Sequence, residues 1–217
     1  MSDVRLRYTT LEIGNMDIHI RILRDLLQFH DTDETAKKLG ISSAAWPMFG
    51  VVWPAGEVLA NLMLDYHVDG KRVLEVGCGI ALASLVLSLR SADITATDHH
   101  PETETFLVYN SELNGGKSIP FVRTGWADLS GNGLGTFDLI IGADLLYESE
   151  HVELLAEFIN QHSRRRCDVI IVDPGRGFHA KFTTKMLSLG YSHIHEKPQN
   201  TDYLDKKFKG WIMTYSR

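Results

Sequence analysis

The sequence predicts an α/β domain with a mostly parallel sheet, preceded by a small N-terminal elaboration. From Lys71 onward, short apolar runs alternate with amphipathic stretches, which is typical of repeated strand–helix units. Turn residues such as Asn114-Gly115-Gly116 and Gly190 separate these segments. The 217 residues, 44% of them hydrophobic, are enough to bury the core of one domain.

The expected strands and helices follow these periodic segments in order. Strands are expected at about residues 72–76, 93–97, 119–123, 137–142, 167–173, 191–196 and 208–215. Helices are expected between them, at about residues 81–90, 101–114, 150–163 and 178–188. Pro101 supports the start of the second helix, because proline suits the first helical turn.

Residues 1–50 are expected to pack on the core as an N-terminal elaboration, and residues 51–217 to form the main domain. Apolar and polar residues alternate in 8–13 and in 17–23. Gly14-Asn15 lies between these runs, so the two strands are expected to pair as a hairpin.

Two helices are expected between the hairpin and the main sheet. The first lies near residues 31–39, where Asp31, Thr32 or Asp33 can cap its start and Gly40 its end. The second begins at Pro54 and runs to about Tyr66.

Charge and cysteine content disfavour several classes of protein. A net charge of -6 argues against binding to nucleic acid, because such proteins usually carry a basic face. The cluster Arg164-Arg165-Arg166 is interpreted as a solvated helix C-terminus. No membrane partner is expected, since residues 1–10 lack the apolar core of a signal peptide and no stretch approaches roughly 18 apolar residues. Cys78 and Cys167 lie far apart, which favours a reducing, cytoplasmic location.

A glycine loop after the first main strand is the clearest sign of a ligand site. In Val73–Ala81, an apolar strand leads through Gly77 and Gly79 into an apolar helix, and glycine lets a ligand approach the main chain. About twenty residues later, Asp98 ends a second strand, at the spacing of a carboxylate that binds ribose hydroxyls. Together these features favour a nucleoside ligand over a purely structural turn.

The composition of the loop narrows the choice of nucleoside. Gly79 is followed directly by Ile80-Ala81-Leu82, without a lysine or a further glycine. Phosphate-binding loops use such residues to surround phosphates. A carboxylate at Glu75 would repel phosphate and attract an amino group. The loop is therefore expected to bind an uncharged or cationic ligand.

Val73–Ala81 resembles motif I of the class I S-adenosylmethionine-dependent methyltransferases, and the resemblance covers about residues 50–217. It implies a Rossmann-like three-layer sandwich with a mostly parallel seven-stranded sheet whose last hairpin is reversed. It also implies S-adenosylmethionine as methyl donor and S-adenosylhomocysteine as product. Ala81 departs from the pattern, because many members have a third glycine there, but the change is mild.

The resemblance also implies which residues bind the donor. Gly77 and Gly79 would line the methionine moiety, with Glu75 supporting their loop. Asp98 would hold the ribose with His99 beside it, and Trp126, after the third strand, would lie beside the adenine. The full expected donor set is Trp53, Glu75, Gly77, Cys78, Gly79, Asp98, His99, Trp126 and Asp144.

Three further segments resemble the non-histone protein-lysine methyltransferases, a group that includes the electron-transfer-flavoprotein lysine methyltransferases. They are Val52–Gly56, Asp144–Tyr147 and Asp173–Arg176. The resemblance implies a protein substrate, with Tyr147, Asp173 and Arg176 at the rim of the acceptor site and the Trp53 indole beside the donor. Each segment alone also has a structural reading, as a core tryptophan, a tyrosine at the sheet edge or an ordinary turn.

Methyl transfer from a sulfonium is an in-line displacement that requires an aligned nucleophile, exclusion of water and a neutral amine. Asp144 and Tyr147 are the candidate catalytic residues that orient this amine by hydrogen bonds. Aromatic faces of Tyr147 and Trp53 would favour the developing cation. No dedicated general base is assigned. No metal is expected, because His193 and His195 share a strand face without a third ligand at suitable spacing.

Other acceptors and other classes of protein stay open. The acceptor could be a small amine, a pyridine nitrogen or a protein histidine, because a fold does not choose its acceptor. An open rim around Asp144 and Arg176 would favour a protein substrate, whereas a lid formed by residues 1–50 would favour a small molecule. A non-catalytic module that binds the donor is a second alternative. A nicotinamide-dependent reductase is disfavoured by the missing third glycine and the lack of a Tyr-x-x-x-Lys helix.

Overall fold

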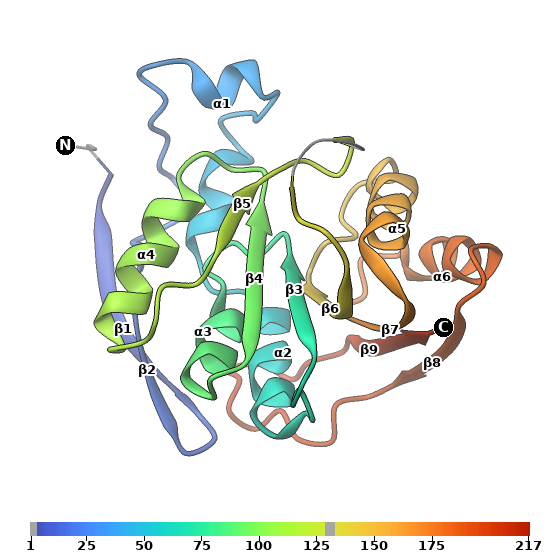
Figure 1. Ribbon diagram of the computed structural model, residues 1–217. Coiled ribbons are helices and arrows are strands. Elements are labelled where there is room, and N and C mark those ends of the chain that lie inside the picture. Colours follow the sequence, from blue (N-terminus) through green and yellow to red (C-terminus); the bar gives the residue numbers. More distant parts are fainter. Residues whose placement is uncertain (1–3, 129–132) are drawn as a thin grey trace.

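The computed structural model describes residues 4–128 and 133–217, and a seven-stranded sheet lies at its centre (Figure 1). Its strands are β3 Arg72–Val76, β4 Asp93–Asp98, β5 Phe121–Arg123, β6 Phe137–Ala143, β7 Ser163–Asp173, β8 Ser192–Glu196 and β9 Trp211–Ser216. Their order across the sheet is β5-β4-β3-β6-β7-β9-β8. All neighbouring pairs are parallel except those of β9, which runs antiparallel to both β7 and β8. The expected reversed last hairpin and mostly parallel sheet are confirmed.

Helices cover both faces of this sheet, which gives three layers. One face carries α2 Pro54–Asp65, α3 Leu82–Leu89 and α4 Thr103–Leu113, and the other carries α5 His151–His162 and α6 His179–Ser188. Alternate side chains of a strand point to opposite faces. Along β6, Leu139 and Ile141 therefore belong to the core beneath α2 and α3, whereas Ile140 belongs to the core beneath α5 and α6.

The start of β7 differs from the prediction. The strand begins at Ser163, where the backbone turns from helical to extended and pairs with Phe137. The Arg164-Arg165-Arg166 cluster therefore lies in a strand and is not a helix C-terminus. Arg164 Nη1 donates to both carboxylate oxygens of Asp138, at 2.9 and 2.7 Å. Arginines fit at this end of the strand because their side chains are exposed.

The N-terminal hairpin forms a separate two-stranded sheet from β1 Leu6–Ile13 and β2 Met16–Leu23. The expected Gly14-Asn15 turn joins the two strands. Asn110 of α4 and Asn114, directly after this helix, attach the sheet to the core, because their amide oxygens accept the backbone N–H groups of Arg21 and His19, each at 2.8 Å. Figure 1 shows the two strands lying along α4 at the border of the domain.

The first expected helix is much shorter than predicted. α1 spans only Thr35–Lys38, because Glu34 adopts a left-handed conformation with φ of 56°. The Asp31 carboxylate still caps the helix start by accepting the N–H groups of Ala36 and Lys37, at 2.8 and 2.9 Å. The loop after Gly40 contains a short 3-10 helix, η1 Trp46–Gly50, that was not predicted. The division of the chain at residue 50 stays a prediction.

One described segment, Trp46–Asp65, is apolar and long enough to cross a membrane, with 20 residues and a mean hydropathy of 1.2. The expectation that no stretch approaches this length was wrong. In the structure the segment comprises η1, an extended connection and α2. The apolar side chains Val58, Leu59 and Met63 of α2 are buried in the core, which accounts for its composition.

Candidate active site

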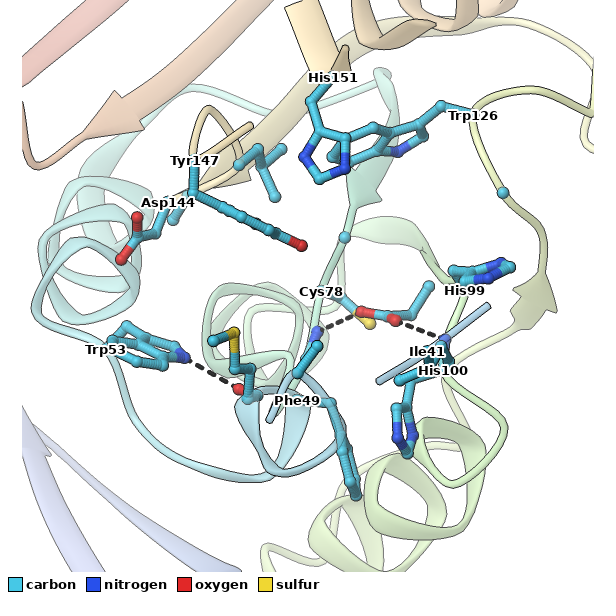
Figure 2. A pocket seen from close by; sticks show the side chains of 18 of the residues that line it. Ile41, Phe49, Trp53, Cys78, His99, His100, Trp126, Asp144, Tyr147 and His151 are labelled. Carbon is cyan, nitrogen blue, oxygen red and sulfur yellow. Dashed lines mark hydrogen bonds between the residues drawn. The ribbon is translucent and has the colours of Figure 1, made fainter. Parts of the chain in front are cut away.

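A cavity of about 580 Å³ lies at the C-terminal ends of β3, β4 and β6, within the usual size range of small-molecule sites. The loops that follow these strands form its floor, and residues 39–53 form one wall. The structure brings together most of the predicted site residues along this cavity: Trp53, Glu75, Gly77, Cys78, Gly79, Asp98, His99, Trp126, Asp144, Tyr147 and Arg176. Figure 2 shows Asp144 and Trp53 on one side of the cavity and His99 and Ile41 on the opposite side.

The two glycines of the loop after β3 are required by geometry. Gly77 has a φ of 58°, and a Cβ atom there would lie 2.6 Å from the Leu145 side chain. Gly79 has a φ of 52°, and a Cβ atom there would lie 3.1 Å from the Phe49 carbonyl oxygen. Ala81, at the start of α3, also has a positive φ of 59°, which explains why a third glycine suits this position.

Asp98 joins two loops at the end of β4. Its Oδ2 atom accepts the N–H of Gly79 and its Oδ1 atom accepts the N–H of His100, both at 2.8 Å. These amides favour the charged carboxylate, although burial raises the pKa of Asp98 on balance. The residue expected to hold a ribose therefore also fixes the glycine loop, and each oxygen retains acceptor capacity on the cavity side.

Glu75 holds the first turn of α3, the helix that follows the same loop. Its carboxylate accepts the backbone N–H of Ser84 at 2.9 Å and also the Ser84 hydroxyl. Burial raises the pKa of Glu75 to about 7, against the hydrogen bonds from Ser84 that favour its charged form. The side chain thus has two protonation states accessible near neutral pH.

The N-terminal segment contributes a wall of the cavity, whose individual residues were not predicted. The His100 ring stacks on Phe49 with the ring centroids 3.9 Å apart, and Trp46 meets both rings edge-on. Burial lowers the pKa of His100 to about 3, so the imidazole is neutral in this stack. Next to it, His99 Nε2 donates to the Leu39 carbonyl oxygen at 3.1 Å. No sequence signal marked Phe49, because an apolar residue of a cavity wall looks like any core residue.

Aromatic side chains line the opposite wall. The His151 ring packs edge-on between Trp126 and Tyr147, with centroids 5.1 and 4.7 Å apart. His151 was not predicted as a site residue, since it opens α5 four positions beyond the Asp144–Tyr147 segment. Burial and the nearby carboxylates of Asp98, Glu148 and Asp144 raise the pKa of Tyr147 to about 12, so its hydroxyl stays protonated.

Asp144 is held in an unusual conformation at the other end of the cavity. Its φ is 58°, a left-handed value that is costly for a residue other than glycine and is often found at functional sites. Both carboxylate oxygens accept hydrogen bonds from Arg176, from Nε at 2.5 Å and from Nη2 at 2.8 Å. The Arg176 guanidinium also lies 5.8 Å from the centre of a Trp53 ring. Asp144 and Arg176 therefore face the cavity as an ion pair.

Asp173 does not lie on the rim, contrary to expectation. It is 0% exposed and does not line the cavity. Its Oδ1 atom accepts the N–H groups of Gly175 at 2.8 Å and of Arg176 at 3.3 Å. The Asp-Pro-Gly turn therefore turns this carboxylate inward, where it fixes the loop that presents Arg176.

Two histidines considered for a metal site also have structural contacts. The rings of His193 and His195 stack on the outermost strand, β8, with centroids 5.2 Å apart. Within residues 4–128 and 133–217, no group of three or more His, Cys, Asp or Glu side chains is arranged to hold a metal ion.

The architecture matches that of known methyltransferases. A putative S-adenosylmethionine-dependent methyltransferase from Streptococcus mutans superposes with a TM-score of 0.68 at 12% sequence identity, over 97% of this chain and 55% of that one. At this identity the likeness concerns the fold alone. The fold is therefore that of a Rossmann-like α/β domain with a mostly parallel seven-stranded sheet.

Sequence comparison identifies the family. Residues 37–186 match the family model described as lysine methyltransferase, and the chain belongs to this family. An electron transfer flavoprotein beta subunit lysine methyltransferase of Xenopus laevis is 32% identical over 134 residues, which cover 60% of this chain and 53% of the relative. A protein N-lysine methyltransferase of Danio rerio is 34% identical over 134 residues, covering 58% of each chain.

One relative has another acceptor in its name. A histone-arginine methyltransferase of Xenopus laevis is 28% identical over 137 residues, covering 59% of this chain and 58% of the relative. The chain thus spans little more than half the length of the curated relatives that it matches.

Proposed function

We propose that this chain transfers a methyl group from S-adenosylmethionine to a lysine side chain of a protein. The observation that carries the proposal is a single cavity with a donor-type glycine loop at one end and an exposed acceptor end. Tyr147 is 43% exposed there, and the Arg176 side chain is 39% exposed. An acceptor on a large partner can therefore reach Asp144. Membership of the lysine methyltransferase family supports this acceptor.

The residues of the cavity fit the donor. The loop through Gly77 and Gly79 leaves no room for side chains where a ligand would approach the main chain. Asp98 offers carboxylate oxygens for ribose hydroxyls, and Trp126 provides an aromatic face for an adenine. Near neutral pH Glu75 can carry the charge that attracts an amino group. When bound, the donor supplies a methyl group that is already activated on a sulfonium.

The chain itself would align the amine and exclude water. Asp144 and Tyr147 provide hydrogen-bonding atoms at the acceptor end, and the rings of Tyr147 and Trp53 favour the cation that develops on nitrogen. Because Tyr147 has a pKa of about 12, it acts as a hydrogen-bonding group and not as a base at neutral pH. The lysine proton passes to solvent before transfer.

The test is incubation of the purified protein with labelled S-adenosylmethionine and a lysate from its source organism, followed by mass spectrometry. Label on a lysine of a discrete protein supports the proposal. Label on histidine or arginine would show methyltransferase activity with an acceptor other than lysine. Label found only on small molecules would exclude a protein substrate. No label, together with no calorimetric binding of the donor or its demethylated product, favours a non-catalytic module.

A further inference from the structure

The ion pair of Asp144 and Arg176 changes what the acceptor end of the cavity can bind. A lone buried carboxylate attracts an ammonium group and raises the pKa of that group. Methyl transfer needs the opposite, because only a neutral amine has a free electron pair for the methyl carbon. A lone Asp144 would therefore hold the acceptor in its unreactive form.

We propose that Arg176 cancels the charge of Asp144, so that the acceptor end binds a neutral amine and does not stabilise its ammonium form. This inference rests on the proposed function and makes Arg176 a positioning residue that acts through Asp144. Asp144 keeps oxygen atoms that accept hydrogen bonds from an amine N–H. The guanidinium stays charged at all physiological pH values, so the compensation does not depend on pH.

The structure holds this pair in place from several directions. The Asp144 side chain is 7% exposed, and its two hydrogen bonds to Arg176 form the planar fork that gives such pairs a fixed geometry. Asp173 fixes the backbone of Arg176, and the Trp53 ring lies beside the guanidinium. Gly175 and Gly177 flank Arg176 with φ values of 98° and 95°, a loop shape that needs glycine. An incidental surface ion pair would lack these supports.

The other charged and titratable groups near the pair leave its role intact. The strongest electrostatic interaction of Arg176 is with Asp144, and weaker ones involve Asp173 and Tyr147. Asp173 also interacts electrostatically with His179. Tyr147 is influenced by Asp98 and Glu148 in addition to the pair. The Glu148 side chain is 61% exposed and lies 3.4 Å from His151, so solvent screens much of its charge.

The amine loses its proton to solvent, and its nitrogen then forms a bond to the methyl carbon while the bond from that carbon to sulfur breaks. The electron pair of the broken bond passes to sulfur, and the positive charge moves to the methylated nitrogen. A lone carboxylate would oppose the loss of the proton, and a lone cation would oppose the new positive charge on nitrogen. The neutral Asp144–Arg176 pair opposes each event less strongly.

The first test compares Arg176→Gln with Arg176→Lys, which retains the charge. Initial rates are measured from pH 6 to 9.5 with the acceptor protein found by labelling. For Arg176→Gln we expect the acidic limb of the kcat profile, which reports the pKa of the bound amine, to move up by about one pH unit, so that kcat falls about tenfold at pH 7 and recovers near pH 9. Arg176→Lys should keep the wild-type limb with a lower maximum. A loss independent of pH, or a shift of equal size in Arg176→Lys, would overturn the inference.

The second test needs no protein acceptor. The binding of n-butylamine, as a probe for the lysine side chain, is measured by ligand-observed NMR on the protein saturated with S-adenosylhomocysteine. Wild-type affinity should rise about tenfold per pH unit between pH 7 and 9, because the neutral fraction of the amine rises by that factor. Arg176→Gln should bind the probe at pH 7 and show a much flatter dependence.

The outcomes separate the two proposals. If the wild type labels no protein but shows the steep butylamine profile, the proposed protein acceptor fails, whereas the selection of a neutral amine at this end of the cavity is supported. If the wild type binds butylammonium as tightly at pH 7 as at pH 9, the inference fails whatever the labelling shows. Donor affinity, measured by calorimetry, should be the same in all three proteins, and its loss in Arg176→Gln would place Arg176 in the donor pocket instead.

Discussion

The Asp98 carboxylate accepts the backbone N–H of Gly79, so the side chain that ends β4 fixes the loop that follows β3. The neighbouring strands β3 and β4 are parallel, and both of their C-terminal ends open into the same cavity. One carboxylate therefore sets both the position of a ligand-binding loop and the charge that a ligand meets there.

Replacing Asp98 with alanine should weaken donor binding and loosen the loop. Loss of a charged hydrogen-bond acceptor costs about 1–3 kcal/mol, so we expect the Kd for S-adenosylmethionine to rise about 10- to 100-fold. The free energy of unfolding should fall by a similar amount, because the N–H groups of Gly79 and His100 lose their partner. Calorimetry and denaturant titration measure the two effects. Asp69→Ala, at a side chain that is 88% exposed, is the matched control and should change neither.

Glu75 should make stability depend on pH in an unusual direction. Its pKa is about 7 in the folded protein and near 4.5 when unfolded. Between these values the folded state binds the extra proton, so the contribution of Glu75 is complete below about pH 4.5 and is lost as pH rises through 7. The difference amounts to about 3 kcal/mol.

The measurement is the free energy of unfolding of the wild type and of Glu75→Gln from pH 5 to 8. The wild-type value minus that of the variant should fall by about 2.5 kcal/mol across this range, since part of the effect lies below pH 5. The low pKa of His100 affects both proteins equally and cancels in the difference. Two curves that run parallel would show that Glu75 does not titrate in this window.

Asp144 and Tyr147 should matter for transfer more than for donor binding. For Asp144→Ala we expect the rate of methyl transfer to fall about 100-fold, because the acceptor loses its alignment, with little change in donor affinity. Tyr147→Phe keeps the ring and should lose about tenfold, the effect of one hydrogen bond. Single-turnover rates and calorimetry separate the two quantities. An equal loss of rate and donor affinity in Asp144→Ala would assign Asp144 to the donor pocket or to the fold.

Ser91 offers a stabilising substitution away from the site. It follows α3 with a φ of 61°, and the Ala92 N–H donates to the Leu87 carbonyl oxygen at 3.0 Å, as in helices that end with a left-handed residue. Glycine avoids the cost of this conformation, so Ser91→Gly should raise the free energy of unfolding by about 0.5–1 kcal/mol in denaturant titration. Ser91→Ala keeps the positive φ and should give no gain.

The main sheet was predictable because its strands are continuous apolar runs, such as Val169–Val172, which only a sheet buried on both faces accommodates. The boundaries were less predictable. The β7 start at Ser163 depends on pairing with Phe137, and the short α1 depends on the conformation of Glu34, neither of which leaves a local pattern.

The site was predictable where backbone geometry dictates residue type. Gly77 and Gly79 need their positive φ values, and Asp98 stands at a fixed distance along the chain from their loop. The partner of Asp144 could not be predicted, because Arg176 is 32 residues away in the sequence. The two residues meet because they follow β6 and β7, which pair side by side in the sheet. The inward turn of Asp173 likewise depends on that packing.

The stack of His100 on Phe49 links the cavity wall to the packing of the N-terminal hairpin. Trp46 and Phe49 belong to the same buried cluster as Ile18 and Ile20 of the hairpin, so cavity wall and hairpin share one packing unit. A ligand that binds only when this wall is closed must stabilise the closed state by linkage, in proportion to its occupancy. Ligand binding and local unfolding of the hairpin and this wall then belong to a single thermodynamic cycle. We therefore expect a core substitution in the hairpin to change ligand affinity without contacting the ligand.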